Sequence, residues 1–234
     1  MNQLLILMQQ QQVPVVFNLA KNQPISQHQC HFEADKLTPQ LCFRKGSENM
    51  IYQLHLWLGN QLIIPSKVGM IKLTNESAWV ILGNRLAQVA HINGNMLQPF
   101  LKEDVVIVKK KVIKDYFEKF ILKVATKVTL DTEGFEVLTD RQLQYATLEI
   151  TEHFMEQSFG LSLQFQYQNT RFYWYDKQRK HTQLLVDKDD IIVQLTERDL
   201  TAEQALIDTL SLLGLSKETT SLFQLKDAKA NYFP

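Results

Sequence analysis

Residues 50–58 of the chain read Met50-Ile-Tyr-Gln-Leu-His-Leu-Trp-Leu58, and large apolar side chains occupy every second position. In an extended chain one face of this stretch carries Met50, Tyr52, Leu54, Leu56 and Leu58. A period of two predicts a half-buried β-strand. Gly59-Asn60 follows as a turn signal and Gln61 to Ile64 resumes the apolar pattern, so the region predicts a β-hairpin.

The rest of the first half reads as short strands separated by tight turns. Gly83-Asn84 and Asn93-Gly94 are turn dipeptides, and Gln9 to Gln12 is interpreted as a polar linker or turn between two strands. The further strands expected here are Pro14–Phe17, His28–Phe32, Val68–Leu73, Ser77–Leu82 and Arg85–Ile92. Their near-regular spacing favours an antiparallel β-meander.

A different periodicity begins at Lys111 and continues to Val128. Apolar residues recur there in steps of three and four, which is one face of a helix. The face consists of Val112, Ile113, Tyr116, Phe117, Phe120, Ile121, Val124 and Ala125. Lysines and Glu118 fill much of the opposite face, and neither Gly nor Pro interrupts the run, so a helix is predicted over Lys111–Val128.

The remainder predicts a second set of strands and a final helix. Thr201 to Gln204 resembles a capping box that starts this helix, and Gly214 suits the position after its last turn. The strands expected before it are Leu143–Phe154, Gly160–Gln168, Arg171–Tyr175, Thr182–Val186 and Ile191–Leu195. The fold class is therefore α+β, with an antiparallel β-meander in the first half followed by helix, antiparallel sheet and helix. We expect a mostly β subdomain over 1–108 and an α+β subdomain over 109–234.

Composition narrows the classes of function. The chain has 234 residues with 25 Lys and Arg against 25 Asp and Glu, and this zero net charge argues against a dedicated nucleic-acid coat protein while allowing a local basic patch. Its longest apolar runs, such as Leu4 to Met8, fall far short of the ~20 residues that cross a membrane. We therefore expect a cytoplasmic protein. The final residues, Asn-Tyr-Phe-Pro, are unusually apolar for a terminus and suggest a fragment of a longer chain.

Motifs for catalysis and metal binding are missing from the sequence. The soft ligands His28, Cys30, His31 and Cys42 have no zinc-site spacing, and both cysteines are interpreted as small core residues. The acidic run from Asp187 to Asp190 lacks the glycine and glutamate of a calcium loop. Phosphate-binding loops and nucleophile elbows are also absent. We expect no enzyme activity of its own, no cofactor and no small-molecule substrate.

One segment combines aromatic and basic residues, which can stack bases and neutralise phosphates. It reads Arg171-Phe-Tyr-Trp-Tyr175 and continues with Lys177, Arg179, Lys180 and His181. The nucleic-acid-binding candidates from it are Arg171, Trp174, Lys177, Arg179 and Lys180. The alternative is a hairpin strand with aromatic core residues and a solvated basic turn. A second candidate cluster is Lys109, Lys110 and Lys111, which precede a predicted helix and can equally form a solvated junction.

Several short motifs occur in an order that resembles a known family. They are Leu97-Gln-Pro-Phe100, Tyr116-Phe-Glu-Lys-Phe-Ile-Leu122, Glu133-Gly-Phe-Glu136, Leu212-Leu-Gly-Leu215 and Phe223-Gln-Leu-Lys-Asp227. The chain resembles the N-terminal accessory region that precedes the ATPase motor of bacterial Swi/Snf-type DEAD/DEAH-box helicases. The likeness extends from about Leu97 to Asp227 and more faintly from Thr38 to Ile92.

The resemblance implies a non-catalytic module that contacts, regulates or helps to load a DNA-translocating motor. It implies two partners, the helicase motor and DNA, and carries no catalytic residue over to this chain. Two alternatives remain open from the residues alone. The first is a stand-alone protein-interaction module that uses a sheet face. The second is an enzyme with an unfamiliar site, for which a deep pocket of coupled acid and base groups would be the sign.

Overall fold

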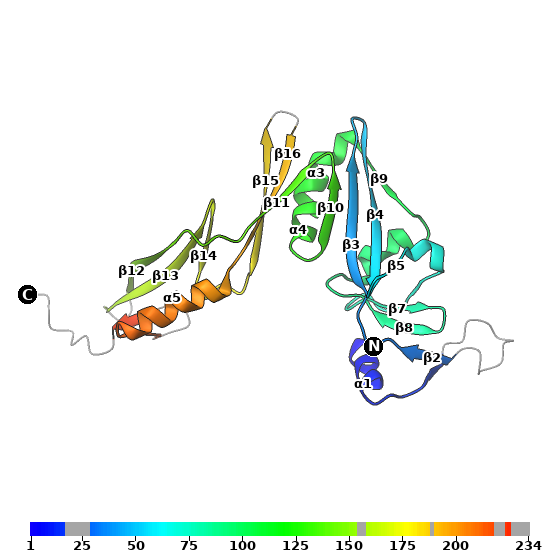
Figure 1. Cartoon of the computed structure of the whole chain (residues 1–234), viewed down its shortest axis with the longest axis horizontal. Helices are drawn as coiled ribbons and strands as arrows, with labels where there is room; N and C mark the ends of the chain where they lie inside the picture. Colours follow the sequence, from blue (N-terminus) through cyan, green and yellow to red (C-terminus); the bar gives the residue numbers. More distant parts are fainter. Residues whose placement is uncertain (17–28, 154–157, 188–189, 218–222, 226–234) are drawn as a thin grey trace, which may run out of the picture. The chain divides into compact units, whose positions relative to one another are not determined.

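The computed structural model describes residues 1–16, 29–153, 158–187, 190–217 and 223–225 (Figure 1). Strands predominate over helices, so the predicted α+β class is confirmed. The chain forms two compact units, Met1–Glu136 with Val186–Ile191, and Val137–Leu185 with Ile192–Pro234. The boundary between the units thus lies near residue 136, whereas the boundary expected from the sequence lies after residue 108. The difference arises because the segment after 108 returns to the first unit, where its strand pairs with residues 40–44.

The first of two sheets described for the first unit has the strand order β1-β2-β8-β7-β6. Its core consists of the buried residues Leu5, Cys30, Trp79, Ile81 and Leu86. Neighbouring strands are antiparallel except β2 and β8, which run parallel, so the sheet is mixed and not the simple meander expected. The strands are β1 (Val15–Val16), β2 (Gln29–Phe32), β6 (Ile71–Lys72), β7 (Trp79–Leu82) and β8 (Arg85–Gln88).

The second sheet of this unit is built around the hairpin predicted from residues 50–64. Strands β4 (Asn49–Leu58) and β5 (Gln61–Ile63) pair antiparallel, and Gly59 takes a positive φ of 56° in the turn between them. Met50, Tyr52, Leu54 and Leu56 are buried on one face of β4 as the alternation predicts. The order of this sheet is β10-β3-β4-β5. Strand β10 (Thr129–Glu133) runs parallel to β3 (Thr38–Lys45), and β9 (Val106–Lys109) pairs antiparallel with β4.

The predicted helix over Lys111–Val128 is present as one helical segment. Its successive parts are η4 (Lys110–Val112), α3 (Ile113–Tyr116), η5 (Phe117–Ile121) and α4 (Leu122–Ala125). The turn over η5 is π-helical, an insertion that shifts the following face. Phe117 and Ile121 nevertheless remain fully buried, and the Phe117 ring packs edge-on against Phe135 with centroids 4.8 Å apart.

Several elements of the first unit differ from the expectations. Gln9 and Gln10 end a helix, α1 (Asn2–Gln10), and are not a linker between strands, because Leu5 is buried and Asn2 accepts a 2.8 Å hydrogen bond from the Trp79 indole. Residues 68–70 are not in a strand, because Val68 ends the 3₁₀ turn η2 (Pro65–Val68) and Gly69 follows it in the left-handed region with a φ of 60°. The short helices α2 (Gly94–Leu97) and η3 (Gln98–Leu101) complete the unit.

Some sequence predictions reach beyond the described residues. Phe17 and His28 lie outside them, as do Phe154, Lys188, Asp189, Lys226 and Asp227. Each of the corresponding segments contains a strand in its described part. Of the helices in the described ranges, none has the length and apolarity needed to cross a membrane.

The second unit is built on the predicted strand over residues 160–168. This strand, β13 (Ser158–Tyr167), pairs antiparallel with β12 (Tyr145–His153), β14 (Thr170–Tyr173) and β18 (Phe223–Leu225). The sheet order is β12-β13-β18-β17, and β17 is Leu215–Lys217. A smaller sheet has the order β11-β16-β15, with β11 (Glu136–Asp140), β15 (Lys180–Asp187) and β16 (Asp190–Glu197).

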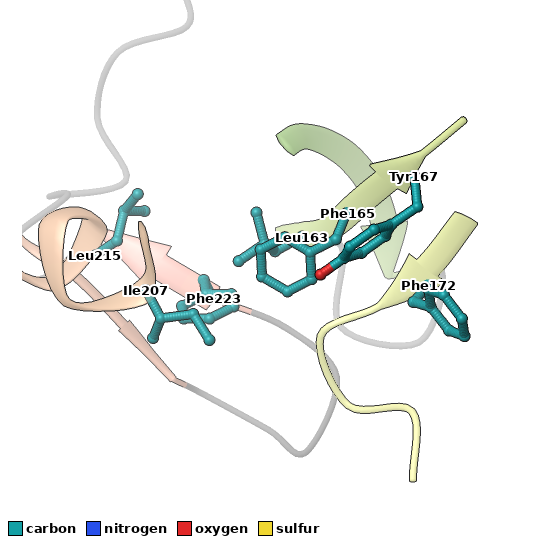
Figure 2. Close-up of a cluster of buried hydrophobic side chains, with 7 residues drawn as sticks. All are labelled: Leu163, Phe165, Tyr167, Phe172, Ile207, Leu215 and Phe223. Atoms are coloured by element: carbon teal, nitrogen blue, oxygen red, sulfur yellow. The ribbon is translucent and has the colours of Figure 1, made fainter. Parts of the chain in front are cut away.

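Helix α5 (Leu200–Leu212) covers one face of the larger sheet of the second unit. Figure 2 shows the cluster between them, which consists of Leu163, Phe165, Tyr167, Phe172, Ile207, Leu215 and Phe223. The predicted apolar face of β13 is confirmed, because Leu163, Phe165 and Tyr167 are all almost completely buried. Ser162 and Gln164 on the opposite face are buried as well, which the alternation did not predict.

The start of α5 differs from the predicted capping box. Asp199 is the N-cap, and its carboxylate accepts hydrogen bonds from the amides of Thr201 and Ala202. Thr201 therefore lies inside the first turn, because the Asp199 carboxylate two residues earlier already satisfies the free amides. Gly214 has a φ of 87° and takes the left-handed position predicted after the last turn.

Candidate functional site

The segment predicted to bind nucleic acid lies in the second unit and begins with β14. The alternation along this strand places Phe172 in the core and leaves Arg171 and Tyr173 exposed on the opposite face. The odd-numbered residues that follow, Tyr175, Lys177 and Arg179, are exposed as well. We call these residues the basic–aromatic stripe, which consists of Arg171, Tyr173, Tyr175, Lys177 and Arg179.

The two tyrosines of the stripe stack on each other. Their ring centroids lie 5.2 Å apart with an interplanar angle of 22°, and the residues are 37% and 41% exposed. In the part of the chain that the structure describes, the ion pairs do not involve Arg171, Lys177 or Arg179. The stripe thus offers aromatic surface between cations whose charge no neighbouring carboxylate neutralises.

The backbone of the loop that carries Lys177 and Arg179 is held by hydrogen bonds from one side chain, Arg198. Arg198 Nη1 donates a 2.6 Å hydrogen bond to the carbonyl oxygen of Asp176 and a 3.4 Å bond to that of Gln178. The carboxylate of Asp176 in turn accepts a 2.8 Å hydrogen bond from the amide of Tyr173. These contacts hold the loop in one shape without using its own cations.

Arg198 is itself held by a buried carboxylate on α5. Its Nη2 lies 2.6 Å from Glu203 Oε2 and its Nε lies 2.9 Å from Oε1, and both side chains are 3% exposed. Tyr167 donates its hydroxyl to Glu203 Oε1 over 2.8 Å, and the same hydroxyl oxygen accepts from the Asp199 amide. Burial and the nearby carboxylate raise the pKa of Tyr167, so the hydroxyl keeps its proton at neutral pH. The positive charge of Arg198 is therefore neutralised within the protein.

A cleft of about 470 Å³ opens beside this network at the start of α5. Its walls include the ring of Trp174 and the side chains of Ile207, Lys177 and Arg179, and Arg198 and Glu203 also line it. The Trp174 ring packs against Phe223 with centroids 4.8 Å apart and meets Tyr175 edge-on at 6.2 Å. The cleft thus adjoins the stripe and shares two of its cations.

The structure places the predicted residues of this segment in different environments. Arg171, Lys177 and Arg179 are exposed, Trp174 is half-buried at the cleft, and Lys180 is half-buried and pairs with Glu197 at 3.4 Å. The candidate set from the sequence omitted Tyr173 and Tyr175. The exposure of Tyr173 follows from the period of two once Phe172 is known to face the core, whereas Tyr175 lies in the turn after β14 and had no such signal.

The second predicted cluster lies in the other unit. Lys109 is the last residue of β9, and Lys110 and Lys111 begin the helical segment. All are exposed, and Lys110 pairs with Glu48 at 3.3 Å. These lysines form a separate candidate surface that has no aromatic stack of its own among the ring contacts of the described residues.

A second hollow, of about 160 Å³, lies in the first unit on strands β3, β4 and β10. Cys42 Sγ and His55 Nδ1 are 3.3 Å apart there, and Asp131 lines the same hollow. Burial raises the pKa of the Cys42 thiol to about 11, and the charge of Asp131 adds to the effect. The thiol is therefore protonated at neutral pH, which makes it a poor nucleophile.

The soft ligands considered for zinc do not converge in the described ranges. Cys30 is buried while its neighbour His31 is exposed, because adjacent residues of a strand face opposite ways. Across the described residues, no group of at least three His, Cys, Asp and Glu side chains is arranged to hold a metal ion.

Comparison with known proteins gives no match for this chain among family models, curated proteins or solved structures.

Proposed function

We propose that the chain is a non-catalytic accessory module of a Swi/Snf-type helicase and that it holds nucleic acid on the basic–aromatic stripe. The observation that carries the proposal is the stacked pair of exposed tyrosines, Tyr173 and Tyr175, between cations that form no ion pair among the described residues. These cations are Arg171 on one side and Lys177 and Arg179 on the other. Stacked aromatic rings bind bases of any sequence, and cations beside them bind the phosphates between those bases. This chemistry suits a module that must follow a moving strand.

The helicase context of the proposal comes from the ordered motifs between Leu97 and Asp227. In such an assembly the motor supplies ATP hydrolysis, and the accessory module contributes contacts to the motor and to DNA. The raised pKa of Cys42, which disfavours thiolate chemistry in the hollow beside His55, agrees with a non-catalytic role.

Binding of fluorescein-labelled DNA to the full chain tests the nucleic-acid part of the proposal. The first variant replaces Arg171, Lys177 and Arg179 by Glu, and the second replaces Lys109, Lys110 and Lys111 by Glu. A control variant replaces the exposed residues Lys102, Lys123 and Lys127 by Glu, so all three variants change the net charge equally. At about 50 mM salt we expect the first to lose DNA binding and the control to keep it. Lys180 stays unchanged because a glutamate there would face Glu197.

Other outcomes of this experiment reassign or reject the interface. Loss of binding in the second variant alone would move the interface to Lys109, Lys110 and Lys111. Equal loss in all variants would indicate attraction by net charge without a specific surface. ATP hydrolysis by the purified chain alone would contradict the accessory role. That role is also tested by reading the coding frame beyond Pro234, where a motor requires a G-x-x-x-x-G-K-[ST] motif followed by an acidic D-E pair.

A stand-alone protein-interaction module is the second candidate, and one observation favours it. The end of α5 leaves Leu212 and Leu213 at 88% and 70% exposure, and Ile150 on β12 is 71% exposed. Large apolar side chains that cluster on a surface are typical of sites that contact another protein, and Leu212 and Leu213 are neighbours in the chain. Absence of DNA binding at low salt would favour this candidate over the first.

A further inference from the structure

We infer that the cleft beside α5 binds one unpaired base of a single nucleic-acid strand, while Lys177 and Arg179 hold the neighbouring phosphates. The inference rests on the proposed function and specifies its ligand. The volume of about 470 Å³ falls within the range of about 300–1,000 Å³ that small-molecule pockets occupy, so a base with its sugar fits.

The walls of the cleft match the faces and edges of a base. The Trp174 ring and the side chains of Ile207 and Leu200 provide apolar surface for the flat faces. Gln204 also lines the cleft, and its Nε2 donates to Asp208 over 2.7 Å, which leaves its carbonyl oxygen to accept from an amino group. Such a mixture of apolar walls and few polar groups is what a base requires.

The charges of the cleft match a nucleotide rather than a free cation or a neutral ligand. Arg198 and Glu203 cancel each other at the floor, where both are buried. Asp176 lines the cleft too and contributes a negative charge, while its Oδ2 accepts a hydrogen bond from the Tyr173 amide. Against this single charge stand the two positive charges of Lys177 and Arg179, which lie on the wall shared with the stripe. A strand can therefore pass along the stripe while one base enters the cleft.

The same geometry disfavours a duplex as the ligand of the cleft. Bases inside a duplex are stacked on both faces, and their exposure requires unpairing at a cost of a few kcal/mol. The Trp174 ring reaches a base face only when that base has left its stack. The stripe alone can contact duplex phosphates, so the duplex is expected to bind more weakly than the single strand.

A cleft-filling substitution separates this inference from the proposed function. Gln204→Trp places a large ring into the cleft from an exposed position on α5, and Ala205→Trp is the matched control on the neighbouring exposed position outside the cleft. Both are titrated with oligo-dT, oligo-rU and a blunt DNA duplex, each of about 12 nucleotides or base pairs. We expect wild type and Ala205→Trp to prefer the single strands by about 10-fold or more, and Gln204→Trp to lose that preference with both sugars.

The outcomes distinguish the two claims. Equal binding of single strand and duplex, or a single-strand preference that survives Gln204→Trp, overturns the inference while the stripe can still bind DNA. Binding to none of the oligonucleotides overturns both claims. Photo-crosslinking with 5-iodouracil oligonucleotides gives a second readout on the unaltered chain. A crosslink to Trp174 is expected, and crosslinks confined to Tyr173 or Tyr175 would contradict occupancy of the cleft.

Discussion

Arg198 and Glu203 form a bidentate ion pair in which both side chains are 3% exposed, with Nη2 and Oε2 only 2.6 Å apart. The pair joins the end of β16 to the first turns of α5. Through Nη1 the same guanidinium also holds the carbonyl oxygens of Asp176 and Gln178. One buried side chain thus connects the core of the second unit to the shape of the loop that carries Lys177 and Arg179.

The first prediction concerns the stability of this pair. Glu203→Gln leaves the Arg198 charge buried without its counter-ion, and we expect the free energy of unfolding to fall by about 3–5 kcal/mol. The double variant Arg198→Met/Glu203→Leu removes both charges and should regain part of that loss, because apolar replacements of a buried pair are often neutral. The regain is incomplete because the Tyr167 hydroxyl and two loop carbonyls lose their partners. Urea unfolding followed by circular dichroism measures both. A single variant as stable as wild type would show that the pair is not buried in solution.

The second prediction separates positioning from folding. In the double variant the loop loses its hydrogen bonds from Arg198, although no unpaired charge is left buried in the core. We expect single-strand affinity to fall by about 10-fold even where stability is regained, since Lys177 and Arg179 are then no longer held in place. Retention of full affinity at restored stability would assign Arg198 a purely structural role.

The third prediction concerns alkaline stability. Burial raises the pKa of Tyr52, Tyr116, Tyr167 and Cys42 above the ordinary values of 10.0 and 9.0. The unfolded chain then loses these protons at lower pH than the folded chain does. The stability that these groups contribute is complete below pH 9 and is lost as the pH rises through the raised values.

The loss of stability is measured as the change in the urea concentration at half-unfolding at pH 7.5, 9 and 10.5. These three pH values lie about 1.5 units apart and bracket the ordinary pKa of a thiol. A Tyr116→Phe/Tyr167→Phe variant has fewer such groups and should lose less stability between the second and third pH. An equal fall in wild type and in the double variant would contradict the assignment to these tyrosines.

The fourth prediction compares Gly134, in the turn between β10 and β11, with Gly59, in the β4–β5 hairpin. Gly134 has a φ of 84°, and a Cβ built on it would lie 2.4 Å from the carbonyl oxygen of Lys45. Gly59 has a φ of 56° and nothing within 4 Å of such an atom. Gly59→Ala should therefore cost only the backbone strain, about 1–2 kcal/mol, and Gly134→Ala about 3 kcal/mol or more. Equal costs in thermal unfolding would show that the turn after β10 relaxes freely.

Local patterns predicted those elements whose periodicity is set by one buried face. The alternation of β4 and β13 and the apolar stripe of Ile113 to Ala125 are of this kind. The parallel pairs β2–β8 and β3–β10 were not predicted, because pairing between distant strands depends on the whole sheet and leaves no local pattern. Helix α1 was not predicted from the sequence. Leu5 is its only buried residue, and one buried position does not make an apolar stripe of helical period.

The candidate site was predicted in part. The basic residues of segment 171–180 could be found from composition, but the distinction between exposed Tyr173 and half-buried Trp174 required the strand register. The Arg198–Glu203 pair had no sequence signal beyond ordinary spacing near a helix start. The cleft depends on α5 packing through Ile207 against Phe223, so it could not be seen before the tertiary structure.

Phosphate binding by the cations of the basic–aromatic stripe is tested by the salt dependence of single-strand affinity. The two proteins compared are wild type and the variant Arg171→Gln/Lys177→Gln/Arg179→Gln. Each cation that binds a phosphate of a single strand contributes about −0.7 to the slope of log affinity against log salt. We expect the variant slope to be shallower by about 2, with folding unchanged. Identical slopes in the two proteins would show that these cations do not bind phosphate and would overturn the proposed interface.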